Sequence, residues 1–323
     1  MEDSKKYAFF EGDFVPLEDA KVSIMTHAFM YGTAIFEGIR AYWNEAHQQM
    51  YLFRLREHIE RMWDSMKILQ LETKYSVDEF CEIVVELMRR NQYKTDSYIR
   101  PSAYKAGLKI GVTLEDCPTE MSVLSVPFGS YFKGVPALKV IVSSWRRVED
   151  NAIPARGKIV GAYVNTALAK ADAVRSGFDD CIVLSEDGHV SEGTGMNIFL
   201  VKHGHLITPC NTANILEGIT RRTVMELAES EYDVKTYCRE VDRSELYIAD
   251  ELFYTGTAAQ VTPIVEVDRR TIGDGKVGPI AGKIAERYIA ICRGEVPAYH
   301  HWLTPVYKQA VGQKSQAKMS AKP

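Results

Sequence analysis

The sequence lacks the features that would place the chain in a membrane or in an oxidising compartment. Its first ten residues, MEDSKKYAFF, contain charges but no apolar segment and no small-residue cleavage site, so we expect no signal peptide. No apolar stretch approaches the length needed to cross a bilayer. The six cysteines are scattered without a CxxC pair, which in a chain of 323 residues predicts reduced thiols. We therefore expect a cytoplasmic protein that does not bind membranes.

An excess of positive charge is also missing. The formal net charge is -4, so no global basic field would attract nucleic acid or an anionic membrane. The two histidine pairs, His203 with His205 and His300 with His301, lack convergent partners, and we expect no metal site. With 46% hydrophobic and 25% charged residues, the composition is that of a globular protein. Any anion that the chain binds must be held by local groups.

The hydrophobic pattern predicts two units joined by a linker. The first unit, residues 1–127, mixes strand-like and helical stretches and forms a small α+β domain. The segment 128–136 (FGSYFKGVP) contains two glycines and a proline, which indicates an interdomain linker. Residues 137–306 form a second and larger unit. Residues 307–323 carry four lysines and no acid, and we expect a flexible tail there.

Periodicity and capping signals locate the main elements. We expect strands at Tyr7–Phe10, Thr33–Tyr42, Met50–Phe53, Ser97–Lys105, Met121–Val126, Leu138–Trp145, Cys181–Leu184 and Met196–Lys202, and helices at Arg56–Leu69, Ser76–Asn91, Tyr163–Ser176, Thr220–Ser230 and Pro279–Cys292.

Lys158 is the first candidate for chemistry. It lies in a segment of small and apolar residues, Ile153–Ala162. Burial lowers the pKa of an amine, and a partly deprotonated amine can form a Schiff base. Most lysines are solvated surface groups, so this context alone leaves both interpretations open.

Three glycine-containing segments could hold a ligand. Ser191–Asn197 (SEGTGMN) lacks the third glycine of a dinucleotide fingerprint, but its glycines would let a flat ligand approach the backbone while Glu192 faces that ligand. Glu217–Arg221 (EGITR) begins a predicted helix, where free N–H groups can bind phosphate. Thr255–Ala259 (TGTAA) is a small-residue turn with spare N–H groups. Each segment could equally be an ordinary bend that binds nothing.

Two predicted strands place polar and aromatic side chains on one face, because residues two apart in a strand point the same way. Tyr98 and Arg100 would form a carboxylate clamp. Phe36, Gly38 and Arg40 would combine an apolar wall, a gap and a cation. The alternative for each strand is an ordinary element with a surface arginine.

Taken together and in this order, these segments resemble the fold-type IV enzymes that depend on pyridoxal phosphate (PLP). They are most similar to the branched-chain amino-acid aminotransferases, and the resemblance runs from about Tyr7 to Cys292. It implies an α/β, D-amino-acid-aminotransferase-like fold in which a small α+β domain and a larger pseudo-barrel domain enclose PLP. The segments that carry the resemblance are Tyr31–Arg40 (YGTAIFEGIR), Glu57–Arg61 (EHIER), Tyr98–Pro101 (YIRP), Lys158, Ser191–Gly193, Glu217–Arg221 and Thr255–Ala259.

The resemblance implies a role for each cofactor-binding residue. Lys158 would form the Schiff base with PLP and shuttle the proton between Cα and C4′. Tyr163 would hydrogen-bond the phenolic oxygen of the cofactor, and Glu192 its ring nitrogen. The phosphate would be held by Arg61, the amides of Ile219 and Thr220, and Thr257.

The resemblance also implies the substrate contacts. Tyr98 and the turn at Thr257–Ala258 would hold the α-carboxylate, and Arg100 would receive the distal carboxylate of glutamate. The pocket for leucine, isoleucine and valine would be formed by Phe36, Gly38, Tyr163, Phe128 and Val112, with Arg40 at its rim and with Tyr31 and Val112 donated by a second subunit.

The implied activity is ping-pong transfer of an amino group between a branched-chain L-amino acid and 2-oxoglutarate, in a homo-oligomer whose active site lies at the subunit interface. The alternatives on the same fold are D-amino-acid transaminase, (R)-amine transaminase and aminodeoxychorismate lyase. A different class of alternative is a PLP-binding homologue without catalysis. The complete set of Lys158, Tyr163, Glu192 and Arg61 argues against that last alternative.

Overall fold

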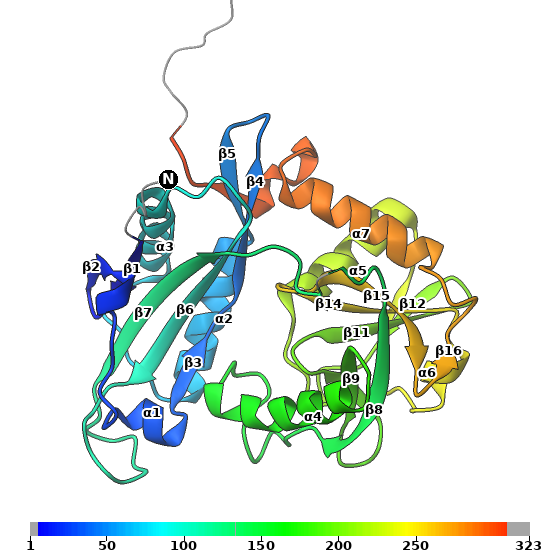
Figure 1. Ribbon diagram of the computed structural model, residues 1–323, viewed down its shortest axis with the longest axis horizontal. Coiled ribbons are helices and arrows are strands. Elements are labelled where there is room, and N and C mark those ends of the chain that lie inside the picture. The colour runs from blue at the N-terminus through cyan, green and yellow to red at the C-terminus, as the bar shows by residue number, and fades with distance from the viewer. Residues whose placement is uncertain (1–5, 133, 309–323) are drawn as a thin grey trace, which may run out of the picture.

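The computed structural model describes residues 6–132 and 134–308, and its two lobes lie side by side, each built on one sheet (Figure 1). Most of the expected tail, together with residues 1–5 of the first unit and residue 133 of the linker, lies outside the described residues. Within the described ranges, no helix is both long and apolar enough to cross a membrane.

The first lobe contains an antiparallel sheet whose strands, with one exception, come from the segment between Tyr7 and Pro127. Its order is β17 (Leu303–Pro305), β5 (Gln49–Phe53), β4 (Ile39–Asn44), β6 (Ser97–Lys105), β7 (Thr119–Pro127), β1 (Tyr7–Phe10) and β2 (Asp13–Pro16), and β3 (Ala34–Phe36) also pairs with β6. The exception is β17, which we placed in the second unit but which pairs with β5. The chain therefore returns to the first lobe before its described end.

The second lobe contains a mixed sheet in which β8 is parallel to both of its neighbours. Its order is β10 (Val190–Gly193), β9 (Asp180–Leu184), β8 (Leu138–Arg146), β15 (Gln260–Val267), β14 (Glu251–Gly256), β11 (Asn197–Lys202), β12 (His205–Thr208) and β13 (Thr236–Cys238), and β16 (Arg270–Thr271) pairs with β15. The two sheets and their helices confirm the expected α/β class.

The helices cover the faces of the two sheets. In the first lobe, α2 and α3 pack on each other and on the sheet, and α1 lies at its lower edge (Figure 1). In the second lobe, α4 packs on β8 and β9, whereas α5 and α7 pack on β14. The helices are α1 (His27–Tyr31), α2 (Leu55–Ile68), α3 (Val77–Asn91), α4 (Tyr163–Arg175), α5 (Ile219–Tyr232), α6 (Glu245–Ile248) and α7 (Pro279–Cys292), with short 3-10 turns at Leu17–Asp19, Val160–Ala162 and Pro297–Trp302.

Local signals explain where several helices begin and end. The expected capping box is present at α3, where Ser76 and Glu79 exchange side-chain and backbone hydrogen bonds. The apolar stripe of α2, which includes Ile59, Met62 and Met66, is buried in the core of the first lobe. The chain leaves α4 at Gly177, whose φ of 81° suits a glycine.

The expected strand over Thr33–Tyr42 is wrong in one respect, because it is split into β3 and β4 at Glu37 and Gly38. The Glu37 side chain is fully buried and the Glu37 amide donates to the Pro101 carbonyl at 2.8 Å. A Cβ at position 38 would collide with the hydroxyl oxygen of Tyr98. A buried carboxylate and a glycine in close contact with β6 therefore interrupt the strand beside the cavity described next.

Candidate active site

A cavity of about 420 Å³ lies between the two lobes. It is lined from the first sheet by Phe36, Tyr98 and Arg100, and from the second sheet by Glu192 and Thr255. Most of the expected site residues meet here, although they are spread over more than 200 positions of the sequence.

Lys158 reaches this cavity from a backbone that is fixed on both sides. Its amide donates to Ser65 Oγ at 3.1 Å, and its carbonyl accepts from the Phe36 amide at 3.1 Å. The Lys158 Nζ donates to Tyr163 Oη at 2.7 Å. Tyr163 is the first residue of α4, and its ring packs on Phe36 with centroids 4.9 Å apart. The amine therefore lies in a defined position beside a phenol.

Glu192 also lines the cavity and is almost fully buried. Its carboxylate pairs with Arg147 Nη2 at 2.9 Å and accepts from Asn197 Nδ2 at 3.0 Å and the Leu216 amide at 3.2 Å. Burial raises the pKa of the Glu192 carboxyl, and the Arg147 charge and the Leu216 N–H oppose part of that rise. A buried carboxylate with oriented donors is suited to bind a protonated ring nitrogen.

The N-terminus of α5 lines the same cavity and offers free N–H groups there, and we call this group of donors the anion seat. The amides of Ile219 and Thr220 have no intrahelical partner, since they are in the first turn, and Gly218 provides no side-chain cap. A Cβ at position 218 would collide with Asn197 Oδ1, so only glycine fits there. The turn between β14 and β15 brings Thr257 and Ala258 to the same cavity.

Arg61 completes this seat from the first lobe. Its Nε and Nη2 donate to the two carboxylate oxygens of Glu37 at 2.8 and 2.9 Å, and its Nη1 donates to the Glu217 carbonyl at 2.7 Å. The guanidinium thus joins α2 to the segment that begins α5. The sequence resemblance implied that Arg61 contacts a phosphate. Such a contact would use the Arg61 N–H groups that these bonds leave free.

The two residues of the expected clamp, Tyr98 and Arg100, both line the cavity from β6. Arg100 Nη2 donates to Tyr98 Oη at 2.9 Å, and the Arg100 guanidinium carbon lies 4.2 Å from the centroid of Phe36. The Arg100 Nε is buried and has no hydrogen-bond partner among the described residues. This part of the cavity lining therefore combines the apolar ring of Phe36 with the cation of Arg100. Gly38 provides the space in which Tyr98 stands.

Four expected site residues, Tyr31, Val112, Phe128 and Arg40, do not line this cavity. Tyr31 and Val112 lie on an exposed face, where the Tyr31 hydroxyl accepts from the Gly111 amide at 3.0 Å. Phe128 lies behind Tyr98, with ring centroids 5.3 Å apart. The expected contribution of Tyr31 and Val112 requires a second copy of the chain and stays a prediction.

Arg40 was expected as a cation at the pocket rim, and the structure places its guanidinium elsewhere. Arg40 is buried, and its guanidinium donates to the carbonyls of Phe128 and Gly129, both at 3.0 Å, and of Ala258 at 3.1 Å. The cation is therefore engaged by backbone oxygens of the linker and of the turn after β14. Arg40 thus holds the Ala258 turn, which lines the cavity, to the linker.

Several residues of the site were not identified from the sequence. Arg147 lies directly after β8, with no spacing that relates it to Glu192. Asn197 belongs to the glycine-rich segment, but the pattern did not show that its side chain holds Glu192. Tyr131 lines the cavity from the expected linker, where an aromatic residue in a glycine-containing segment was the available signal.

The donor set fits PLP. The Lys158 amine suits the aldehyde, the Tyr163 phenol suits the phenolic oxygen, and the buried Glu192 carboxylate suits the ring nitrogen. The α5 amides and Arg61 provide donors for a phosphate. Among the described residues, no group of three His, Cys, Asp or Glu side chains could hold a metal ion.

Comparisons with known proteins agree with this geometry. The family described as "Amino-transferase class IV" matches residues 34–267. A "Probable branched-chain-amino-acid aminotransferase" of Aquifex aeolicus is 50% identical over 304 residues, which cover 94% of this chain and 98% of that protein.

Two solved structures have the same fold. The branched-chain aminotransferase of Thermoproteus uzoniensis with norvaline gives a TM-score of 0.90 at 42% identity, over 94% of this chain and all of that one. The branched-chain amino acid aminotransferase of Thermobaculum terrenum in its PLP-form gives a TM-score of 0.90 at 39% identity, over 95% of this chain and all of that one.

Proposed function

The chain belongs to the class IV aminotransferases and, among them, to the branched-chain-amino-acid aminotransferases, and we propose that it transfers an amino group between branched-chain L-amino acids and 2-oxoglutarate in a ping-pong cycle. One observation carries the proposal: a single cavity contains the Lys158 amine beside Tyr163, the buried Glu192 carboxylate and the open N-terminus of α5. This arrangement matches the polar groups of PLP, the cofactor of this family.

When bound, the cofactor supplies an electron sink that makes the Cα–H bond of the amino acid acidic. Lys158 would hold the cofactor through its amine and would carry the proton between the substrate Cα and the C4′ atom. Tyr163 Oη, 2.7 Å from Lys158 Nζ, orients that amine. Glu192, supported by Arg147 and Asn197, would keep the ring nitrogen protonated.

The substrate end of the cavity supports a dual specificity. Phe36 and Tyr163 provide an apolar wall for a branched side chain. Arg100, whose Nε has no partner among the described residues, provides a cation for the distal carboxylate of glutamate. Tyr98 and the turn at Ala258 would hold the α-carboxylate. One pocket could thus accept both substrates of a ping-pong cycle.

A homo-oligomer is part of the proposal. The face that carries Tyr31 exposes large apolar side chains, including Phe29 at 67%, Ile110 at 80% and Val112 at 77% of their full accessible area. Exposed apolar groups of this size, close together along α1 and the loop that contains Val112, are typical of a surface that another chain covers. We propose that a second copy covers this face and places Tyr31 and Val112 against the partner's cavity.

The test is the visible absorption of PLP-loaded protein during stepwise addition of L-leucine and, in parallel, of D-alanine and an (R)-amine. A change of the cofactor band with L-leucine alone supports the proposal. A change with D-alanine or the amine in its place would reassign the enzyme to a sister activity on the same fold.

Lys158→Ala tests the catalytic role of the lysine. We expect turnover to be abolished, because the variant lacks both the Schiff-base amine and the proton shuttle. Substantial remaining turnover would contradict the mechanism. Loss of PLP binding together with loss of the fold, measured by circular dichroism, would instead indicate a structural role.

A further inference from the structure

A buried carboxylate stands behind the anion seat, and the mechanism above does not use it. Glu37 has no exposed surface and lies in the break between β3 and β4. Its two oxygens accept from Arg61 Nε and Nη2, and Oε2 also accepts from His58 Nδ1 at 2.8 Å. His58 is itself buried in α2, one turn before Arg61. Glu37 is thus the shared acceptor that links Arg61 and His58.

The charges of this network are well defined. Burial alone would raise the pKa of Glu37, but the Arg61 charge and the His58 N–H hold that pKa far below its usual range. Burial lowers the pKa of His58, so the imidazole is neutral and its Nδ1 carries the hydrogen that Glu37 accepts. Glu37 and Arg61 are therefore an ion pair, and His58 is a neutral support.

The network determines which donors of Arg61 remain for a ligand. A guanidinium has five N–H groups. Two of those on Arg61 bind Glu37 and one binds the Glu217 carbonyl, which leaves one N–H on each terminal nitrogen. Two N–H groups on neighbouring nitrogens match two oxygens of a phosphate. Because Arg61 is held from both ends, this fork is in place before a ligand arrives.

We propose that Glu37 and His58 are positioning residues for phosphate recognition, which orient Arg61 so that the cofactor is selected by its phosphate group. The inference rests on the proposed cofactor site and extends it to two residues that touch neither cofactor nor substrate. Long arginine side chains lose much rotamer freedom when a ligand orders them, and an arginine that is already ordered avoids that cost.

A second effect of Glu37 acts in the opposite direction. Its negative charge repels a phosphate, so removing the charge would tighten phosphate binding if orientation did not matter. His58 separates the two effects, because it is neutral and its replacement leaves the charge of the seat unchanged. His58→Leu removes the donor to Glu37, whereas His58→Asn keeps an N–H donor near the position of Nδ1.

The experiment measures the affinity of apoprotein for PLP and for pyridoxal, which lacks the phosphate, from the absorbance of the bound form. Glu37→Gln is expected to weaken PLP binding about ten- to a hundredfold, the value of a lost charged hydrogen bond, and to leave pyridoxal binding nearly unchanged. His58→Leu is expected to lower the PLP preference about two- to tenfold, and His58→Asn to restore it. Glu60→Gln, an exposed carboxylate on α2 that pairs with Arg56, is the matched control and should change neither affinity.

Each outcome decides the inference. An unchanged or higher preference for PLP in folded Glu37→Gln and His58→Leu protein overturns it, and so does an equal loss for both ligands, which would show a general structural role. If Glu37→Gln does not fold, the two His58 variants decide alone. Failure of the unaltered chain to bind PLP at all would instead refute the proposed function.

Discussion

The ion pair of Arg147 with Glu192 offers a sharp test of how the site is built. Both side chains are largely buried, with 11% and 6% of their side-chain areas exposed, and their charged atoms are 2.9 Å apart. We predict that Arg147→Met destabilises the apoprotein, because it leaves the Glu192 carboxylate buried without its cation.

The expected loss in the free energy of unfolding depends on the hydrogen bonds that Glu192 retains in the variant. Removing one partner of a buried ion pair costs about 3–5 kcal/mol. Glu192 retains the hydrogen bonds from Asn197 and the Leu216 amide, which favours the lower end of that range. Arg147 also donates to the Asn214 carbonyl at 3.0 Å, and losing this bond costs about 1 kcal/mol. We therefore expect a loss of about 3–4 kcal/mol in the free energy of unfolding at pH 8.

The loss should depend on pH in a definite direction. Burial already raises the pKa of Glu192, and without Arg147 this pKa rises further. A group whose pKa is raised by folding stabilises the protein below its unfolded pKa, and this stabilisation is lost as pH rises through its folded pKa. The difference between variant and unaltered protein should thus shrink as pH falls from 8 and Glu192 becomes protonated.

Urea unfolding of the apoprotein at several pH values measures this difference. Arg156→Met is the control, because Arg156 is half exposed and its ion pairs with Asp150 and Glu217 are 3.8 and 3.5 Å long. We expect its effect to stay within about 0.5 kcal/mol. A loss for Arg147→Met that does not change with pH, or that equals the control, would refute the reasoning.

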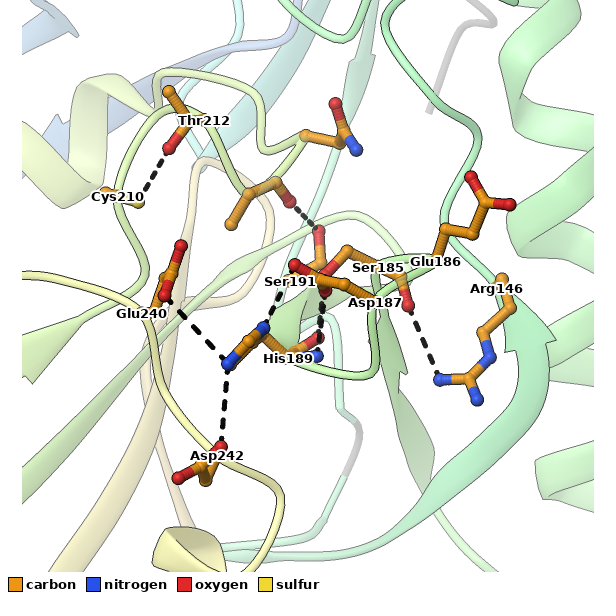
Figure 2. A network of polar contacts seen from close by, with 12 residues as sticks. Arg146, Ser185, Glu186, Asp187, His189, Ser191, Cys210, Thr212, Glu240 and Asp242 are labelled. Carbon is orange, nitrogen blue, oxygen red and sulfur yellow. Dashed lines mark hydrogen bonds and ion pairs between the residues drawn. The ribbon is translucent and has the colours of Figure 1, made fainter.

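Two further predictions concern other parts of the chain. Gly38→Ala should raise KM for the amino acid about tenfold or more with the fold retained, because the new Cβ displaces the Tyr98 hydroxyl; an unchanged KM in steady-state kinetics would contradict this. Hydrogen bonding to Asp187 raises the pKa of His189, which also faces Glu240 and Asp242 (Figure 2). The stabilisation from this contact should be present below the unfolded pKa of about 6.5 and be lost as pH rises through the folded pKa. His189→Gln should therefore reduce the change of the thermal unfolding midpoint between pH 6 and 8. An unaltered pH dependence of that midpoint would show that the contact is not its cause.

Much of the fold was readable from local signals. The capping box at Ser76 and the apolar stripe of α2 depend on residues three or four positions apart, which a single sequence displays. Strands β14 and β15 were not predicted, because β14 is buried on both faces and has no alternation of polar and apolar residues. Only the turn between them, at Thr257 and Ala258, carried a recognisable small-residue pattern.

The candidate site divides in the same way. Lys158 and Tyr163 lie five residues apart on one segment, and Tyr98 and Arg100 two residues apart on one strand, so sequence spacing and the family resemblance could place them. Arg147 could not be placed by spacing, since it meets Glu192 only after β8 and β10 have joined opposite edges of β9. A side chain that acts on a distant carboxylate leaves no periodic signal.

Arg40 shows why a correct strand face is not enough to assign a role. It pairs with Tyr98 across β4 and β6, so its place beside the cavity wall agrees with the face that the sequence suggested. Its role depends on three carbonyl oxygens that come from the linker, about 90 residues away, and from the turn after β14, which is 218 residues away at Ala258. Every residue has a carbonyl oxygen, so the sequence does not show which of these oxygens will accept a hydrogen bond from an arginine. Arg40 is absent from the cavity lining, whereas Arg100 is part of it. Among the arginines of the first lobe that were expected to bind substrate, we therefore expect Arg100 to make the cationic contact.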